Sequence, residues 1–232
     1  MSITYVAPRF VIYRRGDDEF LTANSSVPSV MARIAGEPAV FAAASAQVRG
    51  ARLRSELTTR EIASPEHIAP HSVAIAAAIS RGPHDRDAAL ELDSPFGSGR
   101  FLLLHDPASR EEWGADFRIV CFAQAPLEQE IGIDPFISDV AWSWLVDALD
   151  THGAEYRYLS GTATKTLSSG FGSLATQGDA AQIELRASWT PLGADFAAHA
   201  EAWSELLCLL GGLPHHEGIE SIAAHRARTR GK

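Results

Sequence analysis

The chain has 232 residues, of which 46% are hydrophobic and 21% are charged, and its formal net charge is −9. A chain of this length can bury one sizeable core without disulfide staples, so we expect one domain. The excess of carboxylates argues against nucleic acid or an anionic membrane as the main partner. Two cysteines, Cys121 and Cys208, are too few for a disulfide framework and indicate a reducing, cytoplasmic location. No apolar run is long enough to predict a membrane helix.

Three segments differ in composition. Residues 1–36 carry a weak alternating stretch, an acidic turn and a polar run, and predict a poorly ordered N-terminal extension. Met31 lies just before the first clear element, so a later translational start is an open alternative. Residues 37–214 predict a single domain, and residues 215–232 a disordered tail.

The first half of the domain predicts a helix and then strands. A helix follows Pro38, because apolar residues recur at helical spacing up to Gly50. Alternating patterns then predict strands over 53–60 and 73–79. Three further strands are expected at 88–93, 100–104 and 117–123; the apolar run 101–104 is typical of a central strand.

The second half adds two helices and two strands. Asp134 and Pro135 predict the N-cap and first position of a helix that continues to about residue 149. Strands are expected over 155–167 and 182–189, and a last helix over 195–210. Runs of strands with few helices favour an α+β domain: a largely antiparallel sheet of about seven strands with helices packed on one face. A helix followed by two strands occurs at 38–80 and again at 134–189, which raises the alternative of internal duplication.

Candidate catalytic residues are few. His105 and Asp106 follow the central strand, where a histidine beside a carboxylate is a candidate base with its orienting group. Neighbouring residues of a strand point to opposite faces, so a structural turn at Asp106 is the favoured interpretation. His199 lies on the apolar stripe of the last helix, where a core histidine is favoured over a catalytic one.

Two groups of residues suggest binding. Trp142 and Val146 lie off the main apolar stripe of their helix and need a second surface. Packing against the first helix is favoured over a protein interface, where tryptophan is enriched. A hydroxyl-rich strand face is also expected, flanked by Glu184 and Arg186, with a solvated sheet face as the favoured alternative. Its residues are Tyr156, Tyr158, Thr162 and Thr164.

Metal and cofactor motifs are weak. His67 and His71 are separated by Pro70, which disrupts a common helical face, and the His215-His216-Glu217 tract lies in the predicted tail. The glycines around Phe171 match neither a phosphate loop nor a dinucleotide fingerprint. We therefore predict neither a metal site nor a cofactor.

Several segments resemble a known family. They are GRFLLLHDP at 99–107, VAWSWL at 140–145, GAEY at 153–156, ASWTP at 187–191, and AW and LLC at 202–203 and 206–208. From about Pro38 to Pro214 the chain resembles the actinobacterial proteins grouped as domain-of-unknown-function family 3000. The resemblance implies an actinobacterial, intracellular protein and brings no catalytic residues. Because such proteins are often encoded near a ribonuclease-D-like exonuclease, it also carries a hint of RNA-linked biology.

Three functional hypotheses remain. The favoured one is a non-catalytic binding domain for a protein partner or a second copy of the chain, because the polar residues form no reactive constellation. The second is a small-molecule hydrolase that uses His105, Asp106 and His199. The third is an accessory protein of RNA processing that binds a protein rather than RNA.

Overall fold

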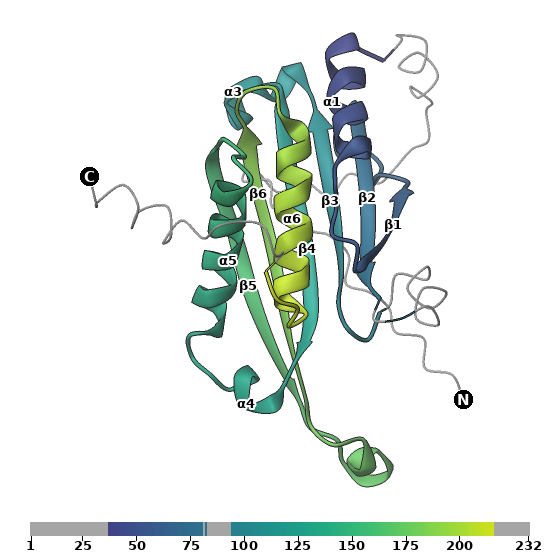
Figure 1. Cartoon of the computed structure of the whole chain (residues 1–232), viewed down its shortest axis with the longest axis vertical. Helices are drawn as coiled ribbons and strands as arrows, with labels where there is room; N and C mark the ends of the chain where they lie inside the picture. Colours follow the sequence, from purple (N-terminus) through teal and green to yellow (C-terminus); the bar gives the residue numbers. More distant parts are fainter. Residues whose placement is uncertain (1–36, 81, 83–93, 216–232) are drawn as a thin grey trace, which may run out of the picture. The chain divides into compact units, whose positions relative to one another are not determined.

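A six-stranded antiparallel sheet organises the described part of the chain (Figure 1). The computed structural model describes residues 37–80, 82 and 94–215, which all lie within a unit that begins at Glu37. The strands are β1 Leu57–Ile62, β2 His71–Ile79, β3 Ser98–His105, β4 Phe117–Leu127, β5 Tyr156–Ser168 and β6 Ala180–Pro191. Their order across the sheet is β1-β2-β3-β4-β6-β5, and all neighbouring pairs are antiparallel. The prediction that 100–104 forms a central strand is confirmed.

Three helices cover one face of this sheet. They are α1 Ala39–Gly50, α5 Ile137–Thr151 and α6 Phe196–Leu210, and α6 lies between the other two (Figure 1). The remaining helical turns are η1 Pro107–Ser109, α3 Arg110–Trp113, α4 Gln129–Gly132 and η2 Gly172–Gln177. We call the covered side of the sheet the helix face and the other side the open face. The predicted α+β class, with helices on one face, is confirmed.

Two predicted boundaries differ from the structure. The first strand begins at Leu57 rather than Leu53, because the preceding residues bond to α6 instead of a neighbouring strand: Arg52 donates its N–H to Glu201. The helix predicted to start at Pro135 starts at Ile137. The Asp134 carboxylate accepts the N–H of Phe136 and so closes a turn ahead of the helix instead of capping it. The strand expected at 88–93 lies outside the described residues.

Helix α6 is buried almost all round because glycine lets a large side chain reach the sheet. Trp203, fully buried, donates its indole N–H to the backbone carbonyl of Phe122 on β4. A Cβ on Gly99 of β3 would come within 3.0 Å of the Trp203 ring. Burying such a ring together with Leu206 and Leu207 contributes roughly 2 kcal/mol or more per side chain. This packing fixes α6 over the centre of the sheet.

An ionic cluster lies on the other side of α6. The Arg54 guanidinium donates to the Glu205 carboxylate at 2.9 Å, to Glu56 and to the carbonyl of Pro214. Arg54 and Glu205 are 8% and 3% exposed. The pKa of Glu56 is lowered to about 2, mainly by its hydrogen bonds from Arg54. The cluster ties the segment between α1 and β1 to α6.

Both edges of the sheet are built from a helix followed by two antiparallel strands. The unit α1-β1-β2 forms one edge and the unit α5-β5-β6 forms the other, in agreement with the repeated element order seen in the sequence. The predictions for residues 1–36 and 216–232 lie outside the described residues; His215 itself lies 3.3 Å from Glu205. None of the helices described is both long and apolar enough to cross a membrane.

Candidate functional site

His105 is part of an aromatic cluster on the helix face. Its ring centroid lies 4.7 Å from that of Phe117, 6.0 Å from Phe41 and 5.9 Å from His71. Burial, and then the nearby His71, lower the pKa of His105, which favours the neutral imidazole. The sequence did not indicate that His71 lies beside His105, because only the strand register places the two residues opposite each other.

The Asp106 side chain has a structural role in a turn. Its carboxylate accepts the N–H of Ala108 and the hydroxyl of Ser109, so it caps the short helix η1. This is the turn expected for Asp before Pro107. His105 and Asp106 therefore engage different partners, as their adjacent positions at the end of a strand require.

His199 is a core residue of α6. Its Nδ1 atom accepts the indole N–H of Trp189 on β6 at 3.1 Å. Burial lowers the pKa of His199 to about 4, so the ring is neutral at physiological pH. Nδ1 of His105 and Nε2 of His199 have no hydrogen-bond partner among the described residues. The ring of His199 contacts Trp189, whereas that of His105 contacts Phe117, and no hydrogen bond joins the two histidines.

The predicted hydroxyl face is divided by a β-bulge. Thr162 and Thr164 lie on the open face, opposite Arg186 and Glu184 of β6. Tyr156 packs against the core of the helix face instead, because the register shifts between Arg157 and Ser160. An extra residue in a strand exchanges the faces of the residues on its two sides. Tyr158 lies within this bulge, at φ 54°, with a largely exposed ring.

Arginines gather on the open face. Arg186 lies over the ring of Phe122, 5.6 Å from its centroid, and its Nε donates to Glu184 at 2.6 Å. Arg118 of β4 donates to the hydroxyls of Ser188 and Thr190, and burial lowers its pKa. Hydroxyl partners therefore stabilise a partly desolvated cation. The sequence alone did not indicate this group, because its members come from separate strands.

Trp142 and Val146 lie beside the edge strand β5. A Cβ on Gly161 of β5 would come within 2.7 Å of Cζ3 of Trp142, so the indole packs directly over this glycine. Both side chains are half-buried. The second surface that Trp142 needs is thus β5 rather than the first helix, because α5 lies over the far edge of the sheet from α1 (Figure 1).

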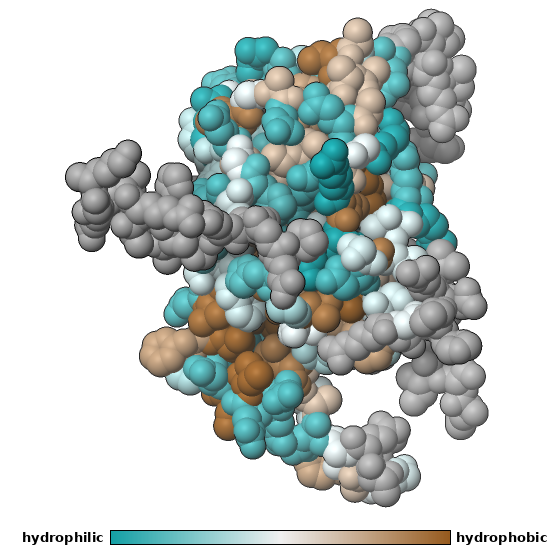
Figure 2. Space-filling view, viewed as in Figure 1, coloured by the Kyte–Doolittle hydropathy of each residue, from teal (hydrophilic) through white to brown (hydrophobic). Residues whose placement is uncertain are grey.

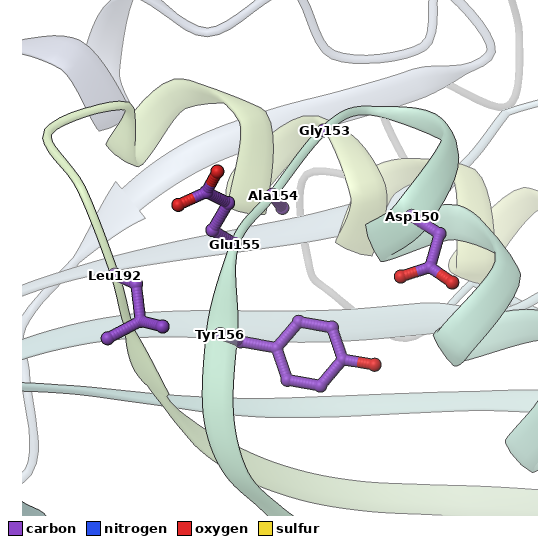
Figure 3. Close-up of a pocket in the computed structure, with 6 residues that line it drawn as sticks. All are labelled: Asp150, Gly153, Ala154, Glu155, Tyr156 and Leu192. Carbon is purple, nitrogen blue, oxygen red and sulfur yellow. The ribbon is translucent and has the colours of Figure 1, made fainter.

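A shallow pocket of about 620 Å³ lies where α5 leads into β5. Its lining residues are Asp150, Gly153, Ala154, Glu155, Tyr156 and Leu192. Figure 3 shows the Tyr156 ring directed toward Asp150 and the Glu155 side chain on the other side of the strand. Burial and then Asp150 raise the pKa of Tyr156, so its phenol remains protonated at neutral pH and can donate a hydrogen bond. This pocket therefore offers a phenol donor beside the carboxylates of Asp150 and Glu155.

Exposed apolar side chains gather around α4 and the start of α5. Four of them occur within ten residues of sequence: Ile131, Ile133, Phe136 and Val140, which are 41%, 64%, 67% and 37% exposed. We call these four residues the α4–α5 surface. Figure 2 shows brown, hydrophobic atoms over this part of the molecule.

Four carboxylates belong to the same stretch of chain as the α4–α5 surface. They are Glu128, Glu130, Asp134 and Asp139, and all are exposed. Helical periodicity does not predict this surface, because most of its residues precede the regular part of α5. The available signal was a run of isoleucine and phenylalanine in an irregular segment that also contains glycine and proline.

Cysteines and metal ligands add no reactive group to these surfaces. Burial raises the pKa values of Cys121 and Cys208 to about 12, which keeps both thiols protonated. Within the described residues, no group of three or more His, Cys, Asp or Glu side chains is arranged to hold a metal ion.

Comparison with known proteins identifies a family. Neither the curated proteins nor the solved structures provide a match to this chain. A family model described as a protein of unknown function, DUF3000, matches residues 37–220, a range that begins at the same residue as the structural unit. The match includes all six strands and the three long helices. The chain therefore belongs to the DUF3000 family.

Proposed function

We propose that this domain is a non-catalytic interaction module that binds another protein through the α4–α5 surface. The observation that carries the proposal is the exposure of four large apolar side chains on one short stretch of chain. Single exposed apolar residues are common on soluble proteins, but a contiguous group rimmed by polar residues is typical of a binding surface.

The acidic rim favours a partner with a particular chemistry. Exposed carboxylates of Glu128, Glu130, Asp134 and Asp139 flank the isoleucines and Phe136 along the chain. A partner segment that presents apolar side chains flanked by arginine or lysine would satisfy both features. The apolar contacts would supply most of the affinity, and the charges would orient the partner and accelerate its association.

The residues of the enzyme hypothesis do not favour catalysis. Burial lowers the pKa values of both His105 and His199, and Asp106 caps a turn. A general base must lie within hydrogen-bonding reach of its substrate, which the burial of both histidines opposes. A protein-binding accessory role in RNA processing would be one form of the proposed activity.

The proposal is tested by differential capture from a lysate of the native host. The full chain and the variants Ile133→Asp and Phe136→Asp are immobilised, with Val40→Asp as the matched control, because Val40 of α1 is also 55% exposed. We expect at least one protein that the wild type and Val40→Asp retain and that both surface variants lose. Retention should weaken at high salt because the rim charges are screened. Identical sets of captured proteins for all four baits would refute the proposal.

A further inference from the structure

The two edges of the sheet differ in how they are protected. Strand β1 has 6 residues and carries Arg60 and Glu61, and Glu61 is paired with Arg49. Strand β5 has 13 residues, and between Ser160 and Ser168 it carries a single charge, that of Lys165. The bulge protects only the start of β5, since the register with β6 is regular from Ser160 onward.

An edge like that of β5 favours strand pairing. Edge strands of soluble proteins are commonly short, charged, bulged or covered, because their outer backbone groups can bond another strand. The outer side of β5 pairs with no strand among the described residues. Most of its side chains from Ser160 to Ser168 are exposed threonine and serine, which favour extended structure without repelling a second strand.

We propose that β5 pairs antiparallel with β5 of a second copy of this chain, with the two-fold axis beside Thr164, in a dimer with a continuous twelve-stranded sheet. The proposal goes beyond the proposed function, because it concerns another partner and the outer edge of β5. The two surfaces are neighbours, since the Lys165 ammonium of β5 donates to the backbone carbonyl of Asp134. An antiparallel strand is complementary to itself about a two-fold axis, as a symmetric dimer requires.

The side chains select the register. With the axis at Thr164, Ser160 lies opposite Ser168, and Thr162 opposite Thr166, so the open face forms a row of hydroxyl pairs. An axis at Lys165 would place two ammonium groups directly opposite each other, which is destabilising. Centring on Thr164 places Lys165 opposite Ala163 and avoids this contact.

On the helix face, this register places a large apolar residue opposite a glycine. Leu167, which is 57% exposed, would lie opposite Gly161 of the second copy. Trp142 already packs over Gly161, so the leucine would extend an existing apolar contact. The half-buried Val146 lies one turn further along α5 and adds apolar area.

The edge has the dimensions of a stable interface. The regular stretch from Ser160 to Ser168 is about 30 Å long. Helix α5, about 10 Å across, lies beside the first part of this stretch (Figure 1), so the profile there is at most roughly 20 Å deep. A profile of at most about 600 Å² per partner lies at the lower end of the range that specific interfaces bury.

The first test is the mass of the full chain in solution. Analytical ultracentrifugation at ~1–100 µM should give twice the 24.9 kDa of one chain. Thr164→Lys should weaken the dimer at least ~10-fold, because it places two like charges beside the axis. Thr59→Lys on β1 is the matched control, since Thr59 is also an exposed threonine on an edge strand. A monomeric wild type, or a dimer that Thr164→Lys does not weaken, would overturn the proposal.

The second test reads the register directly. In Thr164→Cys, mild oxidation should produce a cross-linked dimer, whereas Thr59→Cys should not. The two natural cysteines are buried and do not compete. Failure of Thr164→Cys to cross-link would exclude an axis at this residue.

The surface variants separate this proposal from the proposed function. Phe136→Asp should lose the captured partner and keep the dimer, whereas Thr164→Lys should lose the dimer and keep the partner. A monomeric protein that loses a captured partner through Thr164→Lys would assign β5 to a different protein and refute self-pairing.

Discussion

The ionic cluster at Arg54 and the α4–α5 surface reverse the usual distribution of polarity. Arg54 and Glu205 are buried between α6 and the segment that precedes β1, whereas Ile133 and Phe136 are about two-thirds exposed. The buried charges are matched by partners within the chain, so they contribute to the fold. The exposed apolar side chains have no such local explanation. Residue type therefore does not identify the functional surface here, but residue type together with burial does.

Removing the cation from the ionic cluster should have the largest effect. Arg54→Met leaves Glu205 buried without its guanidinium partner, and breaking such a pair costs about 3–5 kcal/mol of unfolding free energy. Urea denaturation measures the loss. Arg49→Met is the control: the Arg49–Glu61 pair is about half exposed on both sides and should cost at most about 1 kcal/mol. Equal losses for the two variants would show that the cluster does not act as a buried pair.

Lowering the pH tests the buried histidine. The pKa of His199 is about 4 in the folded chain and near 6.5 when the chain unfolds, so the unfolded state binds the proton more tightly. Stability should therefore be complete above about pH 6.5 and fall as the pH decreases toward 4, by about 3 kcal/mol. Denaturation at pH 7.5 and 4.5 measures this change.

Two histidine variants serve as controls for that pH dependence. His199→Phe should remove most of the loss between these pH values, and His105→Phe should remove a further part, because burial also lowers the pKa of His105. An unchanged profile in His199→Phe would assign the proton uptake to another group.

Crowding Gly161 should have an intermediate effect. A Cβ at this position would lie 2.4 Å from the carbonyl of Arg186 and 2.7 Å from Trp142. Gly161→Ala should cost about 1–3 kcal/mol, as overpacking does. Gly50→Ala is the control, since a Cβ there meets nothing within 4 Å, and it should be neutral or slightly stabilising. If Gly161→Ala left the unfolding free energy unchanged, the packing of the Trp142 indole on β5 would not require a glycine at this position.

The smallest change in stability is expected on the α4–α5 surface. Phe136→Asp should alter the unfolding free energy by no more than about 0.5 kcal/mol, because the side chain is mostly exposed. Leu145→Asp, on the buried side of α5, should prevent folding. If Phe136→Asp proved strongly destabilising, the surface would be structural and the contrast with the Arg54 cluster would disappear.

Helical periodicity allowed prediction of the elements that form the core. The apolar stripe of α6 and the apolar run of β3 identified the central helix and a central strand, since burial imposes a local spacing on these residues. Arg54 lies in the strand predicted over 53–60, and its buried ion pair was not predicted because its partner Glu205 is far away in the sequence. Contacts of that kind have no local signal.

Alternation predicted which β5 residues share a face of the sheet only on one side of the β-bulge. Strict alternation placed Tyr156 with Thr162, and the extra residue near Tyr158 separated them. Nothing in the sequence pattern marks this position, which is occupied by a non-glycine residue at positive φ. Arg186 was expected beside the threonines, and the register places it opposite Thr162. Arg118 was not predicted, because its place beside Ser188 and Thr190 depends on the order of strands across the sheet.

The central position of α6 also constrains how a nascent chain acquires this structure. Strands β1 to β4 emerge from the ribosome before the helix that covers them, and β6, which separates β4 from β5, is also made late. Until residues 196–210 have been translated, Phe101, Leu103 and Ile119 lack the cover of Trp203 and its neighbours. Such an uncovered sheet is a substrate for chaperones and is prone to aggregate.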